Sequence, residues 1–272
     1  MDDIKLLGLQ RAEFQRAETY SSRSNKAQIL IVIISIISVF VNNSNIVYSL
    51  TLACLIVAIV WLYFSFQAKT SHSTAERARR AIVLRNGLGI KLSRKMYSDL
   101  IMQFKIKEND GTKWENSNYF ETTSEYGYKK LTDIVEESSF WSKHLFRISA
   151  IHYWVYFVAS LCLSIVGLTI IPLLNIGSLN ILVSRVFCLI LIWLITGNLF
   201  TTAMAFTSTA NSIDAIESRL SNMVKNLEPD EDILILVGDY NSLLESTPTI
   251  PSKIYLKNRD KLNRLWDERN AY

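Results

Sequence analysis

Apolar residues form four long runs along the chain, and almost all charged residues lie in the segments outside them. The runs cover residues 27–41, 46–66, 150–174 and 179–206. An α-helix rises ~1.5 Å per residue, so about 20 apolar residues cross a hydrocarbon core ~30 Å thick. The last three runs reach this length, and the first reaches it if its helix starts within residues 21–26. The pattern predicts four transmembrane helices, with a re-entrant first segment as the alternative.

Two short turns without charge join the runs in pairs. Residues 42–45 read Asn-Asn-Ser-Asn, and residues 175–178 read Asn-Ile-Gly-Ser. A connection of four residues is too short to hold structure of its own, so the second helix of each pair must return directly across the membrane. We therefore expect two transmembrane hairpins.

The polar segments predict where the chain lies relative to the membrane. Of the 29 Lys and Arg residues, 28 fall within three polar segments, and Arg185 is the exception. By the positive-inside rule, all three segments and both termini belong to the cytoplasmic side. The predicted order is an N-terminal cytosolic helix (1–26), a first hairpin (27–66), a cytosolic helical insert (67–149), a second hairpin (150–206) and a cytosolic helical tail (207–272).

Apolar residues recur every three or four positions in the polar segments, which predicts helices there as well. Leu131, Ile134 and Leu145 share one face before the third run, and Ile213 and Leu220 share one after the fourth. We expect these two faces to pack on each other. Further helices are predicted over residues 2–26, 92–105, 230–244 and 252–269, with an irregular loop over 108–128. The expected fold class is an all-α membrane protein with cytosolic helical extensions.

The overall charge of the chain does not indicate a binding partner other than lipid. The net charge of +4 follows from this topology and from contact with anionic lipid, so DNA or RNA binding is not indicated. Cys54, Cys162 and Cys188 lie inside apolar runs without CxxC spacing, so they are interpreted as small hydrophobic residues. Residues 1–26 are too charged for the apolar region of a signal peptide.

Catalytic motifs are not found in the sequence. It contains no GxSxG, P-loop or HExxH motif, and its three histidines are scattered, so neither an enzyme nor a metal or cofactor site is predicted. Glu136 and Glu137 are adjacent, and adjacent helix positions point ~100° apart. This pair therefore predicts a solvated helix face, not paired catalytic carboxylates.

Small and weakly polar residues form stripes on the second pair of helices. Ser160 and Ser164 recur on the third helix, and Asn198 and Thr201 on the fourth. Such stripes either let helices approach closely or line a water-filled path within a homo-oligomer, and both interpretations stay open. Arg185 lies near the outer end of the fourth helix, where it acts as a headgroup anchor or as a gate.

The insert offers cations that suit phosphate groups. Arg77, Arg79 and Arg80 are possible contacts for a nucleotide phosphate, with Trp114 and Tyr119 as stacking planes. The alternative is positive charge that faces anionic lipid next to the membrane.

Two stretches resemble a known family. These are YFETTSEYGYKKLTDIVEESSFWSKHLFRISAIHYW (119–154) and IPSKIYLKNRDKLNRLWDERN (250–270), and they look like the SMODS-associating four-transmembrane effectors of bacterial anti-phage systems. The order of two hairpins around a cytosolic insert is similar too. No ligand motif of the family can be matched here residue by residue.

The resemblance implies a function in abortive infection. A neighbouring nucleotidyltransferase or cyclase would make a cyclic (oligo)nucleotide, residues 77–147 would sense it, and the effector would permeabilise the bacterial inner membrane. Two alternatives are a small constitutive channel or transporter subunit and a membrane scaffold without conductance.

Overall fold

The structure is a computed structural model of the 272-residue chain. It describes residues 3–114, 120, 122–173, 179–225 and 231–270. Within these ranges the regular elements are helices and no strand occurs, so the prediction of an all-α chain is confirmed.

Four stretches of helix are long and apolar enough to cross a membrane: Ile4–Val39, Ser44–Leu88, Tyr128–Ile170 and Ile181–Met223. They belong to α1 (Asp3–Val39), α2 (Ser44–Leu88), α5 (Tyr128–Leu173), and α6 (Leu179–Thr196) followed by α7 (Asn198–Lys225). The predicted number of spanning helices is confirmed in terms of length and composition. Each stretch is longer than its apolar run, because helix continues into the polar residues beside the run.

The chain forms two compact units. One, which we call the apolar unit, contains Thr19–Gln67 and Ala150–Met204. The other, the polar unit, contains Met1–Glu18, Ala68–Ser149 and Ala205–Tyr272. Helices α1, α2, α5 and α7 each contribute residues to both units without a break.

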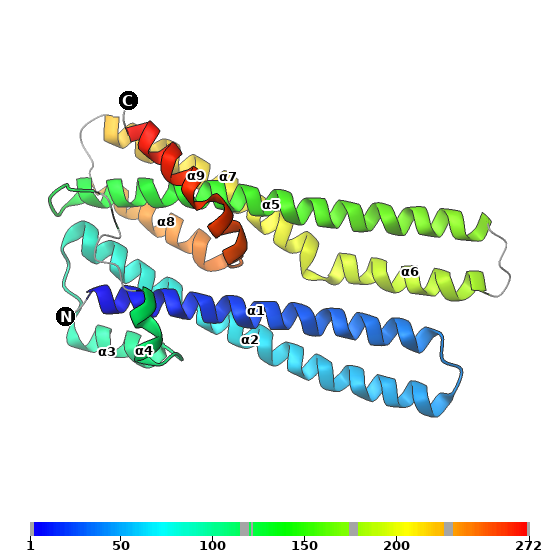
Figure 1. Cartoon of the computed structure of the whole chain (residues 1–272). Helices are drawn as coiled ribbons and strands as arrows, with labels where there is room; N and C mark the ends of the chain where they lie inside the picture. Colours follow the sequence, from blue (N-terminus) through cyan, green and yellow to red (C-terminus); the bar gives the residue numbers. More distant parts are fainter. Residues whose placement is uncertain (1–2, 115–119, 121, 174–178, 226–230, 271–272) are drawn as a thin grey trace. The chain divides into compact units, whose positions relative to one another are not determined.

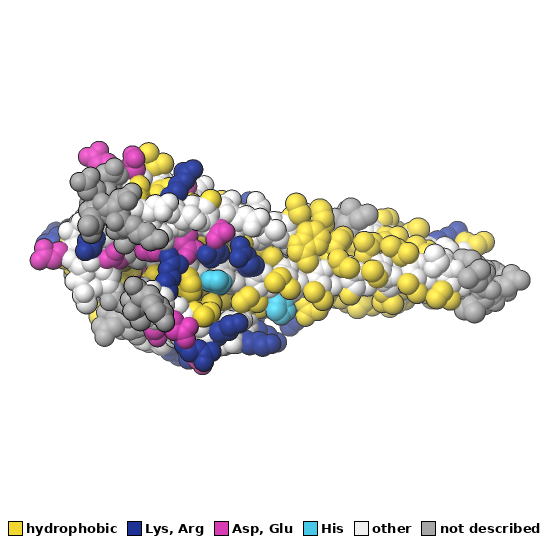
Figure 2. Space-filling view, turned by 90° about the horizontal axis from the view of Figure 1, so that it is seen from above, with side chains coloured by type: hydrophobic (Ala, Val, Ile, Leu, Met, Phe, Trp, Pro, Cys, Tyr) yellow, Lys and Arg dark blue, Asp and Glu magenta, His cyan; other side chains and the backbone are white. Residues whose placement is uncertain are grey.

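In the apolar unit, α1 lies beside α2, and α5 lies beside α6 (Figure 1). Cys54 of α2 places its Sγ atom 3.9 Å from the carbonyl oxygen of Ile31 in α1. The rings of Phe157 in α5 and Phe200 in α7 lie 5.4 Å apart. Hydrophobic side chains cover much of the surface that these helices present in Figure 2.

Local chemistry sets the helix ends in this unit. The side-chain oxygen of Asn43 accepts a hydrogen bond from the backbone N–H of Asn45 at 3.0 Å, which caps the start of α2. The fourth apolar run was expected to form one helix, but a single residue, Gly197, separates α6 from α7. A Cβ atom at Gly197 would overlap the carbonyl oxygen of Trp193, so glycine fits this interruption.

In the polar unit, the predicted faces of α5 and α7 do pack on each other. Leu131, Ile134, Ile213 and Leu220 are all fully buried. Across the contact, Lys143 Nζ lies 3.0 Å from Asp214 Oδ1. This part of the sequence prediction is confirmed.

A second core lies at the start of the chain. Leu6, Leu7 and Leu9 of α1 are buried with Ile82 of α2 and with Phe104, which follows α3 (Arg94–Gln103). Two short helical turns, α4 (Glu108–Gly111) and η1 (Thr112–Trp114), occupy part of the expected loop. The tail forms α8 (Asp232–Ser246) and α9 (Ser252–Asn270), close to the predicted ranges.

Candidate functional site

Arg79, one of the three candidate phosphate contacts, is buried inside the polar unit. Its side chain is 11% exposed, and Nε donates to Glu76 Oε2 at 2.7 Å. Its Nη2 donates to Asn241 Oδ1 at 2.9 Å, and the guanidinium carbon lies 5.3 Å from the ring centroid of Tyr240. Arg79 therefore joins α2 to α8.

Arg77 and Arg80 have other partners and are more accessible. Arg77 is exposed, and its Nη1 donates to Gln103 Oε1 of α3 at 3.0 Å. Arg80, whose side chain is 41% exposed, donates to Glu245 Oε2 of α8 at 2.6 Å. The three arginines thus point to three different acceptors. Trp114 is exposed in η1, and Tyr119 lies outside the described residues.

Tyr240 extends the buried polar contacts from α8 to α5. Its hydroxyl group donates to the carbonyl oxygen of Ser138 at 2.9 Å and lies 2.8 Å from Ser142 Oγ. Burial raises the pKa of Tyr240, so the phenol stays protonated and can donate. Through Arg79 and Tyr240, helices α2, α8 and α5 are held by hydrogen bonds as well as by apolar packing.

A group of ion pairs joins α5, α7 and α9, and we call it the three-helix ion cluster. It consists of Glu136, Lys143, Asp214, Glu217, Ser221 and Arg269. Arg269 Nη2 lies 2.6 Å from Glu136 Oε1, and its Nη1 contacts Glu217. Lys143 binds Glu217 Oε2 from the other side at 2.5 Å, and Ser221 Oγ donates to Glu136 Oε1 at 2.8 Å.

Two points of this cluster differ from what the sequence predicts. Glu136 does not lie on a freely solvated face, because its side chain is 15% exposed and accepts hydrogen bonds from Arg269 and Ser221. The role of Arg269 is not predicted by any pattern in the sequence. The two residues are 133 positions apart, so local periodicity carries no signal for the pair.

The same arginine also holds the C-terminal helix by cation–π contacts. Its guanidinium carbon lies 5.7 Å from the ring centroids of both Phe140 and Trp266. Trp266 and Leu262 of α9 are 7% and 2% exposed. Helix α9 is therefore held to α5 and α7 by two kinds of contact at once.

The candidate pore residues of α5 lie in a helix contact. Ser164 is 2% exposed, and its Oγ donates to the carbonyl oxygen of Ser160 at 2.9 Å. On the same face, a Cβ atom at Gly167 would overlap the Phe187 ring of α6. Within one chain this arrangement favours close helix packing for Ser160 and Ser164. On α7, Thr201 is exposed, and the side chain of Asn198 lies outside the described part.

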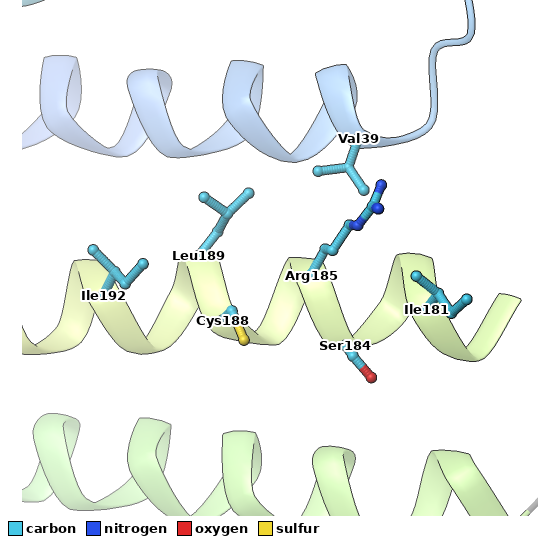
Figure 3. A pocket seen from close by; sticks show the side chains of 7 residues that line it. All are labelled: Val39, Ile181, Ser184, Arg185, Cys188, Leu189 and Ile192. Carbon is cyan, nitrogen blue, oxygen red and sulfur yellow. The ribbon is translucent and has the colours of Figure 1, made fainter.

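A largely open cavity of about 630 Å³ lies at one end of the apolar unit. Its lining residues are Val39, Ile181, Ser184, Arg185, Cys188, Leu189 and Ile192. Figure 3 shows the Arg185 side chain directed from α6 towards Val39, the last residue of α1. The cavity is thus apolar apart from Ser184 and a single cation.

The described residues contain no group of three or more His, Cys, Asp or Glu side chains that could hold a metal ion. His72 instead joins α2 to the end of α8, with Nε2 3.3 Å from the carbonyl oxygen of Leu244 and Nδ1 3.1 Å from Thr249 Oγ1. The three cysteines are free thiols in the apolar unit.

Comparisons with protein-family models, with curated proteins and with solved structures each found no match. The resemblance to four-transmembrane effectors therefore stays a prediction based on the two sequence stretches.

Proposed function

We propose that this chain is a membrane-disrupting or pore-forming effector of a bacterial anti-phage system. In this proposal the polar unit binds a cyclic nucleotide, and the apolar unit then permeabilises the inner membrane. The observation that carries the proposal is the continuity of α1, α2 and α5, each of which contributes residues to both units. Such helices give a ligand in water a direct connection to segments in lipid.

Contacts within the polar unit support the proposed topology of two hairpins. The rings of Phe14 and His72 lie 5.7 Å apart, and His72 contacts Thr249. These residues belong to the N-terminal segment, the insert and the tail. Because groups in contact share one compartment, the chain must cross the membrane an even number of times between them. The excess of Lys and Arg in these segments favours the cytoplasm as that compartment.

The proposed messenger site uses the accessible arginines of α2. Guanidinium groups bind phosphate through paired, charge-assisted hydrogen bonds. A bound phosphate would take Arg77 from Gln103 and Arg80 from Glu245, and so loosen the contacts of α2 with α3 and α8. Arg79, which is buried in the unit, would keep α2 and α8 in position. Release of such contacts would shift the helices that enter the membrane.

In the proposed open state, several copies of the chain assemble. Ser160, Ser164, Asn198 and Thr201 would line the path, after rearrangement of the α5–α6 contact. The first alternative, a constitutive channel or transporter, needs no ligand. The second, a scaffold, conducts under no condition.

The test is dye release from liposomes that contain the full chain. Cyclic dinucleotides and cyclic trinucleotides are added, one compound at a time, to vesicles loaded with a self-quenching dye. We expect release with one of these nucleotides and none without it. The double substitution of Arg77→Gln and Arg80→Gln should raise the nucleotide concentration needed at least tenfold, because two charge-assisted contacts are lost. Arg94→Gln, which removes an exposed arginine from the start of α3, serves as the matched control.

Each alternative gives a different result in this assay. Release without any nucleotide would identify a constitutive channel. A chain that inserts normally but releases no dye with any of the nucleotides would contradict the effector proposal and favour the scaffold.

A further inference from the structure

The charge of Arg185 cannot be balanced within the apolar unit. The two stretches of this unit contain Arg23, Lys26 and Arg185 but neither Asp nor Glu. A guanidinium group stays protonated at any physiological pH, and an uncompensated charge in an apolar medium is costly. A second copy of the unit would bring no carboxylate either. An anion that neutralises Arg185 would therefore have to come from outside the unit.

The position of Arg185 matches the depth of a lipid headgroup. It is the seventh residue of α6, so it lies ~9 Å along the helix from its start. The cavity around it also includes Val39, where α1 ends. Both helix ends therefore belong to the same end of the unit, where a spanning helix would meet the headgroups.

The shape and lining of the cavity suit one phospholipid. Ile181, Arg185, Cys188 and Ile192 recur at intervals of three and four residues, so they form one stripe along α6. Ile181 and Ile192 offer an apolar wall to an acyl chain, whereas Arg185 offers a planar donor pair to a phosphate. The open side of the cavity allows a lipid to enter from the bilayer.

We propose that the cavity between α1 and α6 binds a single phospholipid, with its phosphate on Arg185 and an acyl chain along Ile181 and Ile192. The inference rests on the membrane location proposed above, but not on the effector activity. The lipid would bridge the two pairs of spanning helices, because Val39 belongs to the first pair and Arg185 to the second.

Native mass spectrometry of the full chain in a neutral detergent tests this site. The probes are phosphatidylglycerol, diacylglycerol with the same acyl chains, and inorganic phosphate. We expect one phosphatidylglycerol to bind about tenfold more tightly than diacylglycerol, because one charge-assisted contact is added. Arg185→Gln should remove this preference. Cys188→Ala, which changes the same lining without changing its charge, should retain it.

Three results would overturn the lipid site. They are equal binding of both lipids, an unchanged preference in Arg185→Gln, and displacement of phosphatidylglycerol by inorganic phosphate at an equal concentration. The last result would identify a site for free phosphate. Arg185→Lys keeps the charge but loses the planar donor pair, so a preference a few-fold weaker than that of the parent chain is expected.

Two further measurements separate this inference from the proposed function. Circular dichroism shows whether each variant keeps its helices, and flotation with liposomes shows whether it enters membranes. If Arg185→Gln loses its helices, the test uses Arg185→Lys instead. A preference of Arg185→Lys for phosphatidylglycerol as strong as that of the parent chain would then overturn the site. A chain that does not float would contradict the membrane location itself, whereas a chain that floats without a phosphate preference would contradict the lipid site alone.

Discussion

The polar unit has a core of fully buried large apolar side chains, whereas the apolar unit leaves many such side chains exposed. Ile134 and Leu220 in the polar unit are fully buried, but Ile56 and Leu163 in the apolar unit are 63% and 72% exposed. In water, removal of apolar surface stabilises a fold by ~25 cal/mol per Å². The apolar unit does not make use of this effect over much of its surface, which is the surface expected of helices that cross a membrane.

Polar groups show the same contrast. In the polar unit, charges of both signs meet in pairs, as in the three-helix ion cluster, and Tyr240 has hydrogen-bond partners inside the core. The apolar unit holds no acidic residue, and its helices approach through small residues such as Gly167. Helices in lipid gain little from apolar burial, so they associate by close packing of this kind.

The largest expected effect is that of a lysine placed on an exposed residue of the apolar unit. A lysine on an exposed apolar residue of the polar unit is the comparison. Leu163→Lys should reduce membrane insertion by about 3 kcal/mol, because Lys at the centre of a spanning helix must leave water. Met102→Lys, at a residue of α3 that is 77% exposed, should change stability by no more than about 0.5 kcal/mol. The fraction of chain that floats with liposomes measures the first effect, and thermal unfolding measures the second. Normal flotation of Leu163→Lys would contradict a lipid-facing surface at this position.

A smaller effect is expected from the removal of one arginine from α9. Arg269→Ala should destabilise the docking of α9 by about 1–2 kcal/mol, because Glu136 and Glu217 lose a partner and the guanidinium is only partly exposed. Arg259→Ala removes an arginine of the same helix that pairs with its neighbour Asp260 at the surface, and should have almost no effect. Amide hydrogen exchange of α9 is the measurement. Equal exchange in both variants would mean that the ion cluster does not hold the helix.

The smallest expected effect concerns two glycines. Gly167→Ala should destabilise the α5–α6 contact by about 1 kcal/mol, because the added methyl group meets the Phe187 ring. Gly238→Ala in α8 meets no atom within 4 Å and should stabilise the polar unit by about 0.5–1 kcal/mol. Thermal unfolding in detergent, followed by circular dichroism, compares the two. If both variants are stabilised, close packing at Gly167 is not needed.

The parts of the fold that sequence patterns predicted are those set by local periodicity. The apolar runs predicted the four spanning helices, and the spacing of Leu131, Ile134 and Ile213 predicted the packed faces of α5 and α7. A helix brings residues three and four positions apart onto one side, so such faces are visible in the sequence alone. The break at Gly197 was not predicted, because an isolated glycine within a long apolar run often lies inside an unbroken helix.

Contacts between distant segments could not be predicted in this way. The pairs Arg79–Asn241 and Arg269–Glu136 join residues 162 and 133 positions apart. The arginine run of α2 suggested one phosphate site, but a helix turns ~100° per residue and directs neighbouring side chains to different acceptors. Membrane sidedness, oligomerisation and the messenger are not encoded in local spacing at all, so they stay predictions.

The interruption at Gly197 lies inside the apolar unit and gives its fourth apolar run a mechanical property that the other three lack. Helices α1, α2, α5 and α7 each pass from one unit to the other as continuous rods, so a rotation at one end of such a rod reaches the other end. Between α7 and α6, by contrast, a rotation can be absorbed by the backbone torsion angles of a single glycine. Helix α6, which carries Arg185, can therefore change its tilt without a break inside α7.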